Sequence, residues 1–587
     1  MRTSIVRTLT LSFAVLLGAG AAPVARAGGT DAANQRFPDL VDRYLERFAS
    51  FHPSIAAGNG IHGHDGELED FSAAAIAREL RWLRASRVEL ATLDDDRLSV
   101  DERADRRILV GIIDGWILDL ATVRTWQRNP MIYVSAVSDG LHDLVTMEAS
   151  PAERRMQHVV TKLGALPRLL AAARENVRHP PRVFVERAIA MLGGVEDLLG
   201  HDLPLAFAAS GDPALKERLA RAAAVAAREL GAYRRTLETN GLATATGSFA
   251  IGTANVEARY RAEELIDLPA AQLLAIGNRE LALKQAEFTA TAARIDANQA
   301  PLEVWHGVQK DHPPPGALVP AARAVVEELF AFIDARALVR LPPNEHVTVA
   351  PAPAYDLGLA SMHSSPPLEP NPVKSYYYVT DADPAWPPAQ QEAWLRTFNY
   401  ATLADISAHE VAPGHYVHSL FMRRTPGKVR RIWVGLNPFP QPSSGQDGWA
   451  HYAEQMVSDE GFRSERPAYR LAQIAESLTR ICRLVAGLKL HSGEWSVEDA
   501  TALFEREAHM EAVAARREAV RGAYDPTYGG YFLGKLAAFK LRRDYQAANG
   551  AAFDLREFHE RVMTDGIAPW AVHRQLLLPD DKGAVID

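Results

Sequence analysis

Apolar residues recur at spacings of three and four along most of this chain, and this spacing constrains its fold more than any other feature. Residues 30–245 are rich in Leu, Ala, Arg and Glu, and segment 218–230 is typical of them. Such spacing gives a helix one apolar face that has to be buried against other helices. Segments 258–297 and 320–336 predict further long helices, and helices return from about residue 388. Because no alternation of strands and helices is present, we expect a mostly α fold.

The composition changes between residues 311 and 390. This stretch holds 15 of the 36 prolines, a residue that regular helices exclude from their interior. Within it, segments 347–350 and 375–380 have the β-branched and aromatic residues of short strands. We therefore expect a small β insertion in a helical chain of 587 residues. The expected regions are a signal peptide (1–27), an N-terminal helical region (28–245), a helical and Pro-rich region with short strands (246–390) and a C-terminal helical region (391–587).

The N-terminus has the pattern of an export signal. Arg2 and Arg7 precede an apolar stretch from about residue 9 to residue 22, and Ala25 and Ala27 form a small-x-small cleavage site. We expect cleavage after Ala27 and a protein that is periplasmic or secreted. No later segment has the roughly 18 uncharged apolar residues that a membrane span needs, so no membrane span is expected.

Charge and cysteine content exclude other classes of protein. The 64 basic and 73 acidic residues give a net charge of −9, and the basic residues form no stripe, so we expect no nucleic-acid partner. The single cysteine, Cys482, excludes an intrachain disulfide and a thiolate zinc cluster. It lies in an apolar-periodic segment, where we expect it to be a small buried side chain.

The segment His409-Glu410-Val411-Ala412-Pro413-Gly414-His415 carries the residues of hydrolytic metal chemistry. Two neutral imidazoles can hold a zinc ion, and a carboxylate beside the first can take a proton from water. The histidines are separated by six residues, about 600° of rotation, so a straight helix would hold them roughly 120° apart. Pro413 and Gly414 therefore predict a break at the end of a helix, which turns His415 back toward His409.

A second segment, residues 447–454, is expected to begin another helix. Asp447, His451 and Glu454 occupy positions i, i+4 and i+7, so they would share one helix face. A zinc site with two histidines commonly takes its third ligand, a carboxylate, from a following helix. Asp447 is the first candidate. Glu454 is either an alternative ligand or a group that supports a ligand, and His451 is a candidate for substrate binding.

These two motifs resemble those of the bacterial family catalogued as domain of unknown function 885, a zincin-like group expected to be metallopeptidases. The family's HE-x-x-PGH motif matches residues 409–415, and its EGWAxYxE motif matches residues 447–454. Further matches follow in the family's order, near residues 53–70, 129–141, 166–170, 531–542 and 558–559. The resemblance implies a large multi-helix, zincin-like metallopeptidase fold around a deep cleft, with one zinc ion and a peptide or small amide substrate.

The chain departs from the family pattern at the candidate site. Asp447 stands where the family has glutamate, which is one methylene longer, and His418 replaces a glutamine. The family's YPGQA-like stretch is also altered here, within residues 524–531.

Tyrosines supply the remaining candidates. Tyr531 is our candidate for the oxyanion donor, because it lies in a segment that matches the family and other zincins use tyrosine in this way. Residues 376–378 are three consecutive tyrosines, and we expect an edge strand there, along which a peptide pairs by backbone hydrogen bonds. Tyr377 and Tyr378 are therefore candidates for substrate binding.

The sequence thus predicts an exported zinc-dependent hydrolase, specifically a metallopeptidase of short peptides with Glu410 as the general base. One zinc ion would be held by His409, His415 and either Asp447 or Glu454. Two alternatives stay open. One is a catalytically inactive helical periplasmic protein for binding or scaffolding, and the other is a zinc hydrolase of non-peptide amides or esters. The oligomeric state is not predicted.

Overall fold

The structure is a computed structural model that describes residues 30–147, 149–343, 345–352, 360–437 and 444–587, with side chains from residue 36 onward. It is built mostly of α-helices, with one small sheet, as the sequence predicts. The expected signal peptide, residues 1–27, lies outside the described residues.

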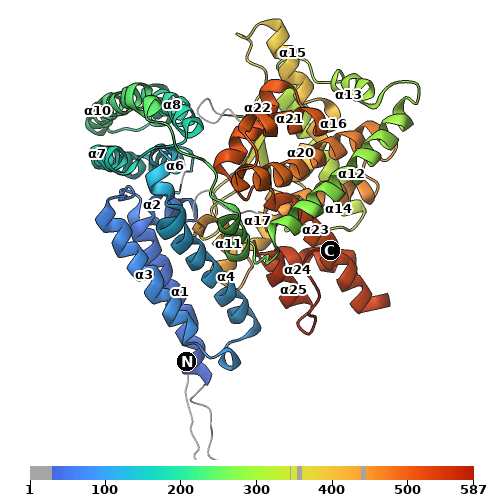
Figure 1. The fold of residues 1–587 in the computed structure, drawn as a ribbon, viewed down its shortest axis with the longest axis horizontal. Helices are drawn as coiled ribbons and strands as arrows, with labels where there is room; N and C mark the ends of the chain where they lie inside the picture. Colours follow the sequence, from blue (N-terminus) through green and yellow to red (C-terminus); the bar gives the residue numbers. More distant parts are fainter. Residues whose placement is uncertain (1–29, 148, 344, 353–359, 438–443) are drawn as a thin grey trace, which may run out of the picture.

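Helices of the first half of the chain form one side of the molecule (Figure 1). They are α1 (Thr30–Phe51), α2 (Pro53–Gly58), α3 (Ala73–Ala91), α4 (Val100–Leu118), α5 (Thr125–Arg128), α6 (Met131–Thr146), α7 (Ala152–Asn176), α8 (Arg182–Asp197), α9 (Leu203–Ala206) and α10 (Pro213–Thr236). Next along the chain come α11 (Thr253–Glu263), α12 (Ala270–Ile295), α13 (Pro301–Gln309) and α14 (Leu318–Ala335).

Helices of the second half, drawn yellow to red, form the other side together with α12, α13 and α14 (Figure 1). They are α15 (Pro388–Thr397), α16 (Tyr400–Glu410), α17 (His415–Met422), α18 (Lys428–Ile432), α19 (Asp447–Asp459), α20 (Pro467–Ser492), α21 (Val497–Glu507), α22 (Ala512–Tyr524), α23 (Gly530–Asn549), α24 (Leu555–Thr564) and α25 (Trp570–Leu577). Short 3-10 and π turns join several helices, namely η1 (His62–His64), η2 (Asp95–Arg97), η3 (Asp119–Val123), η4 (Leu198–Asp202), η5 (Leu237–Gly241), η6 (Val434–Leu436) and η7 (Gly550–Ala552).

The helix expected over residues 258–297 is two helices. α11 ends at Glu263, and Pro269 forms the N-cap of α12, where its fixed φ suits a helix start. The helix expected over 320–336 is confirmed as α14. Cys482 is fully buried in α20, also as expected.

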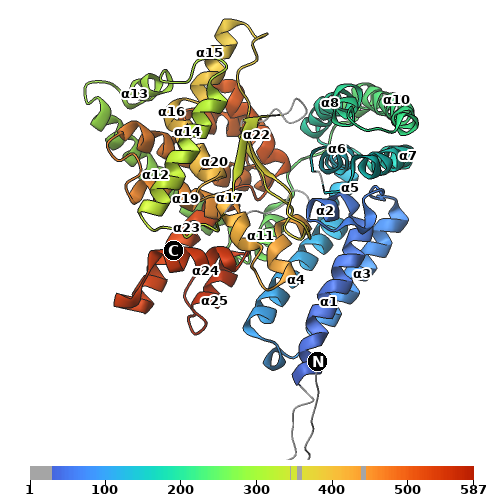
Figure 2. The same ribbon diagram turned by 180° about the vertical axis from the view of Figure 1, so that it is seen from behind.

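Three strands form the sheet, in the order β1-β3-β2, beside α14 (Figure 2). β1 (Val347–Pro351) pairs in parallel with β3 (Ser375–Val379), and β2 (Ala360–His363) pairs antiparallel with the other side of β3. β1 and β3 are the strands that the sequence predicts, whereas β2 is not predicted. The expectation that residues 376–378 form an edge strand is wrong, because β3 is the central strand and both of its edges are paired. The free edge nearest the candidate site belongs to β2.

The apolar cores extend across the expected regions. One core joins α6, α7, α8 and α10 to residues of α20, α21 and α22, such as Cys482 and Phe504. Another joins α1, α3 and α4 to α18 and α25, through side chains such as Trp433 and Val572. The two sides of the molecule are therefore packed against each other through shared apolar side chains. Among the described residues, no helix is long and apolar enough to cross a membrane.

Candidate metal centre

The helix that carries His409 and Glu410 starts and stops at residues suited to it. Asn399 caps the start of α16, where its Oδ1 accepts hydrogen bonds from the backbone N–H groups of Ala401 and Thr402. α16 ends at Glu410, and a new helix, α17, begins at His415. The break that Pro413 and Gly414 predict is thus confirmed.

Gly414 is required at this break because the chain folds back on itself. A Cβ atom at this position would lie 1.7 Å from the carbonyl oxygen of His409, so no other residue fits without moving the backbone. The indole Nε1 of Trp449 donates a hydrogen bond to the carbonyl oxygen of Pro413 at 2.9 Å, which fastens the turn to α19. The fold-back brings Nε2 of His415 to 3.1 Å from Nε2 of His409.

Asp447 completes a triangle of potential ligand atoms. It is the first residue of α19, and its Oδ1 lies 3.8 Å from Nε2 of His409 and 3.9 Å from Nε2 of His415. A triangle with sides of 3.1, 3.8 and 3.9 Å has a circumradius of about 2.1 Å, so one point lies at zinc–ligand distance from all three atoms. The residues present therefore fit a zinc ion.

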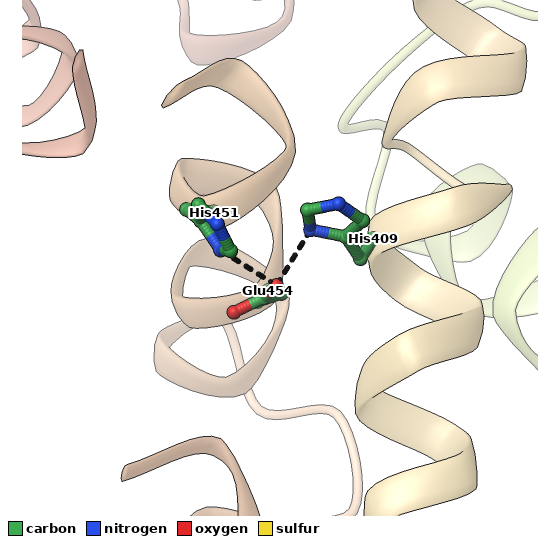
Figure 3. A group of neighbouring side chains, drawn as sticks. All are labelled: His409, His451 and Glu454. Atoms are coloured by element: carbon green, nitrogen blue, oxygen red, sulfur yellow. Dashed lines mark hydrogen bonds and ion pairs between the residues drawn. The ribbon is translucent and has the colours of Figure 1, made fainter. Parts of the chain in front are cut away.

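Glu454 lies on the other side of the His409 ring, two turns further along α19. Its Oε1 is 2.7 Å from Nδ1 of His409 and 2.9 Å from Nδ1 of His451, and both rings point at this carboxylate (Figure 3). The guanidinium Nε of Arg480 donates to Nε2 of His451 at 3.2 Å. We assign the protons from this chain of contacts. The Nδ1–H groups of His409 and His451 both donate to Glu454, so Nε2 of His409 carries a free lone pair.

Among the described side chains, two groups each bring three potential ligand atoms together, and His409 belongs to both groups. In the group of His409, His451 and Glu454, hydrogen bonds already connect the three side chains, and all three are buried. In the group of His409, His415 and Asp447, the last two line a cavity. The second group is therefore the better candidate for an ion that has to meet a substrate, with Glu454 orienting His409 from behind.

The ionisable groups of the site are shifted in different directions. Burial would lower the pKa of His409, but the hydrogen bond and the charge of Glu454 raise it. Burial lowers the pKa of His415 to about 3 and that of His451 to about 3, so both rings are neutral at pH 7. Burial and the nearby charge of Asp447 raise the pKa of Glu410 to about 7, although the charge of His409 works against this rise. A carboxylate with a pKa near 7 suits general acid–base chemistry at neutral pH.

The cavity beside this group has a volume of about 670 Å³. One wall holds Glu410, His415 and Asp447, and residues of β2 and the loop after it, 360–362 and 364–367, also line the cavity. Much of the remaining lining comes from the N-terminal half of the chain, mainly from α2 and α6. A cavity of this size is typical of small-molecule sites.

β2 connects the sheet to the site. The backbone N–H of Met362 hydrogen-bonds to the carboxylate of Glu410, which works against the rise in its pKa. Because only β3 pairs with β2, the other edge of this strand has backbone groups that no strand of the described residues uses.

The remaining sequence-predicted residues lie at different depths. Tyr377 is fully buried, with its hydroxyl 3.3 Å from that of Ser407, and neither Tyr377 nor Tyr378 lines the cavity. Tyr531 lies behind His451, with ring centroids 6.3 Å apart, and its hydroxyl accepts a hydrogen bond from Arg521 rather than facing the cavity. His418 does line the cavity, and its Nε2 is 3.3 Å from the carbonyl oxygen of Gly566.

Sequence reasoning missed three parts of this site. Arg480 is twenty-six residues beyond Glu454 and on another helix, so no spacing rule connects it to His409. Met362 acts through its backbone, which the identity of the side chain does not reveal. The wall formed by α6 belongs to a segment about 270 residues before His409, and only the tertiary fold brings it close.

Comparison with known proteins adds a family and a fold. The sequence model of a family described as bacterial protein of unknown function (DUF885) matches residues 53–577. None of the curated proteins matches the chain.

Two solved structures have the same fold. One is described as a candidate lipoprotein of unknown function from Shewanella oneidensis; it has a TM-score of 0.77 and 23% identity, and the match covers 92% of this chain and 99% of that one. The other is described as a candidate lipoprotein from Colwellia psychrerythraea, with a TM-score of 0.77, 17% identity, and coverage of 93% and 98%. At such identities the likeness shows the fold alone.

Proposed function

We propose that this chain, which belongs to the bacterial family of proteins of unknown function DUF885, is an exported zinc-dependent hydrolase that cleaves short peptides. The observation that carries the proposal is the convergence of Nε2 of His409, Nε2 of His415 and Oδ1 of Asp447 on one point at zinc–ligand distance. The mostly helical fold around a cavity supports the comparison with helical zincin-like peptidases.

The geometry favours Asp447 over Glu454 as the third ligand. Oε1 of Glu454 faces Nδ1 of His409, on the side of the ring away from His415. A carboxylate in this position fixes the tautomer of a ligating histidine and raises its basicity. Glu454 would therefore hold His409 in place rather than bind the ion.

Glu410 supplies the acid–base chemistry in this proposal. Zinc, when bound, supplies electrophilic activation of water and of the scissile carbonyl group. Glu410 lines the same cavity as His415 and Asp447, takes a proton from the attacking water, and later gives one to the leaving nitrogen. The hydrogen bond from the backbone of Met362 orients this carboxylate.

Export is part of the proposal. The N-terminal pattern of Arg2, an apolar stretch and Ala25-Arg26-Ala27 supports it. The two solved structures with this fold are described as candidate lipoproteins, which agrees with export.

The test compares the wild-type protein with Glu410→Gln, using Glu465→Gln as a matched control on the surface, where the Glu465 side chain is 70% exposed. Zinc content is measured by elemental analysis, and turnover is measured on a panel of di- to pentapeptides, non-peptide amides and esters. We expect one zinc per chain in all three proteins, and peptide turnover only in the wild type and in Glu465→Gln.

Each other outcome points to a specific alternative. Turnover of only the non-peptide compounds would keep the zinc hydrolase and replace its substrate. A protein that binds no zinc stoichiometrically and turns over nothing would favour a binding or scaffold role. Unchanged turnover in Glu410→Gln would remove the proposed general base.

A further inference from the structure

The part of the cavity wall that comes from the N-terminal half of the chain carries a group of carboxylates. Asp139 and Asp143 lie one turn apart on α6 and face the cavity together with Ser135, one turn earlier. Glu69 lines the same wall, and its carboxylate accepts hydrogen bonds from the backbone N–H and the hydroxyl of Ser54, at 2.9 and 3.0 Å. This group is separate from the residues that would hold the ion.

Asp143 has no partner of its own in this wall. Its carboxylate makes no hydrogen bond or ion pair with any residue that the structure describes, whereas Asp139 accepts a hydrogen bond from the hydroxyl of Ser138 at 3.0 Å. Asp143 is half-buried, and one of its carboxylate oxygens would lie 3.1 Å from a Cβ atom placed on Gly58. Burial, and then the charge of Asp139, raise the pKa of Asp143 to about 7. An unpaired carboxylate in such surroundings favours a cation beside it.

The cations near this wall do not neutralise it from inside the cavity. Lys162 is only 1% exposed, does not line the cavity, and donates to the carbonyl oxygen of Glu67 at 2.8 Å. Arg431 is the one lysine or arginine among the described lining residues, and its Nε donates to the carbonyl oxygen of Thr425. The charge that the cavity offers to a substrate is therefore negative on the α6 side.

β2 places this wall close to the candidate catalytic groups. The backbone of Met362 contacts Glu410, and the ring of the next residue, His363, lies tilted against that of His142 of α6, with ring centroids 5.4 Å apart. His363 is also close enough to Asp143 for its charge to lower the pKa of that carboxyl. Two adjacent residues of one strand thus connect the two walls, so a group held by Asp143 would lie near the bond that Glu410 acts on.

We infer that the α6 wall binds a positively charged ammonium group of the substrate, and that Asp139 and Asp143 determine specificity by pairing with it. This inference rests on the proposed function for the reaction, but not for the binding. The ammonium has two chemical sources in a peptide, the free N-terminus and a lysine side chain. Both offer three N–H donors to a pair of carboxylates.

The test measures binding without turnover. Isothermal titration calorimetry at pH 8 compares three dipeptides, Ala-Ala, N-acetyl-Ala-Ala and N-acetyl-Lys-Ala, on the zinc-supplemented Glu410→Gln protein and on the same protein without added metal. We expect at least one ammonium-bearing dipeptide to bind about tenfold or more tightly than N-acetyl-Ala-Ala, because its ammonium can donate charge-assisted hydrogen bonds to the carboxylates of Asp139 and Asp143. Preference for Ala-Ala identifies the N-terminus as the source, and preference for N-acetyl-Lys-Ala identifies the side chain.

Variants locate the preference on α6. In the Glu410→Gln protein, the double change Asp139→Asn with Asp143→Asn is expected to abolish the preference for an ammonium-bearing dipeptide. If the double variant folds poorly, Asp143→Asn alone is tested, and it is expected to reduce this preference. Asp94→Asn with Asp96→Asn is the matched control and should keep the preference, because Asp94 is the exposed N-cap of η2 and Asp96 lies exposed within this turn. Equal affinity for the three dipeptides, no binding of either ammonium-bearing dipeptide, or a preference that survives the Asp143 change overturns the inference. If Glu410→Gln shows the preference but the wild type hydrolyses none of the peptides, the proposed reaction alone is overturned.

Discussion

Oε1 of Glu454 lies 2.7 Å from Nδ1 of His409, and the opposite nitrogen of the same ring faces His415 and Asp447. One nitrogen of the imidazole is thereby committed to a buried carboxylate, and the other nitrogen faces the two other candidate ligands. The contacts of His451 and Arg480 with one another and with Glu454 hold this carboxylate in turn. The orientation of His409 is therefore set by a chain of buried polar groups that extends away from the cavity.

Removing the charge of Glu454 should weaken zinc binding without removing any ligand. In Glu454→Gln we expect the zinc affinity to fall about 10- to 100-fold, because His409 loses the carboxylate that orients it and raises its basicity. Competition with a chromophoric chelator measures the affinity, and Glu465→Gln serves as the control. An unchanged affinity would mean that Glu454 does not act on the ion through His409.

Gly414→Ala should disrupt the site through the backbone. The added Cβ atom would lie 1.7 Å from the carbonyl oxygen of His409, so the fold-back between α16 and α17 has to open. We expect a loss of at least about 3 kcal/mol in the free energy of unfolding and the loss of zinc binding. Urea denaturation and elemental analysis measure the two effects.

Gly164 offers the matched control for this change. It lies within α7, and nothing lies within 4 Å of a Cβ atom placed on it. Gly164→Ala should therefore stabilise the protein by about 0.5–1 kcal/mol, because Ala loses less backbone entropy in a helix. Equal effects of the two substitutions would contradict the role we assign to Gly414.

The ion pair between Glu518 and Arg483 should give the protein an acid-sensitive contribution to stability. Burial by itself would raise the pKa of Glu518, but the charge and the two hydrogen bonds of Arg483, at 2.7 and 3.0 Å, lower it to about 2. A lowered carboxyl pKa stabilises the fold above the ordinary value of 4.5, and this contribution is lost as the pH falls from 4.5 toward 2. The shift corresponds to about 3 kcal/mol at neutral pH.

Glu518→Gln removes this contribution, so the variant should be less stable than the wild type at pH 7. The difference should shrink as the pH falls from 4.5 toward 2. Urea titrations of both proteins at pH 7, 4 and 3 measure it. A difference that stays constant over this range would contradict the lowered pKa of Glu518.

Much of the candidate site follows from local sequence. The break before His415 is predictable because Pro413 and Gly414 cannot continue a helix in the usual way. The start of α19 at Asp447 is predictable from the spacing of apolar residues, and that spacing also places Asp447 and Glu454 on one face. The choice between these two carboxylates is not predictable, because it depends on which edge of the His409 ring each one meets.

The sheet and the far wall of the cavity depend on contacts between distant segments. β2 has only four residues, Ala360–His363, without the alternation that marks a strand. Its pairing with β3 makes β3 central and overturns the expectation of an edge strand at the three tyrosines. Likewise, Asp139 and Asp143 look like polar positions of an ordinary helix until the packing of the two halves places them in the same cavity as Glu410.

The length of the side chain at position 447 gives the most direct test of the geometry. The family motif has glutamate there, whereas this chain has aspartate, and the Oδ1 atom of Asp447 already lies where a zinc ion can be reached from both histidines. Because Asp447→Glu adds one methylene to a side chain whose Oδ1 atom already lies at zinc–ligand distance from the central point of the triangle, we expect weaker zinc binding than in the wild type. Asp447→Asn keeps the length and removes the charge, and it should weaken binding as well. Isothermal titration calorimetry with zinc measures both variants. Tighter binding by Asp447→Glu would mean that the backbone of α19 lies further from the ion than the triangle of ligand atoms implies. Glu454 would then again be a candidate for the third ligand.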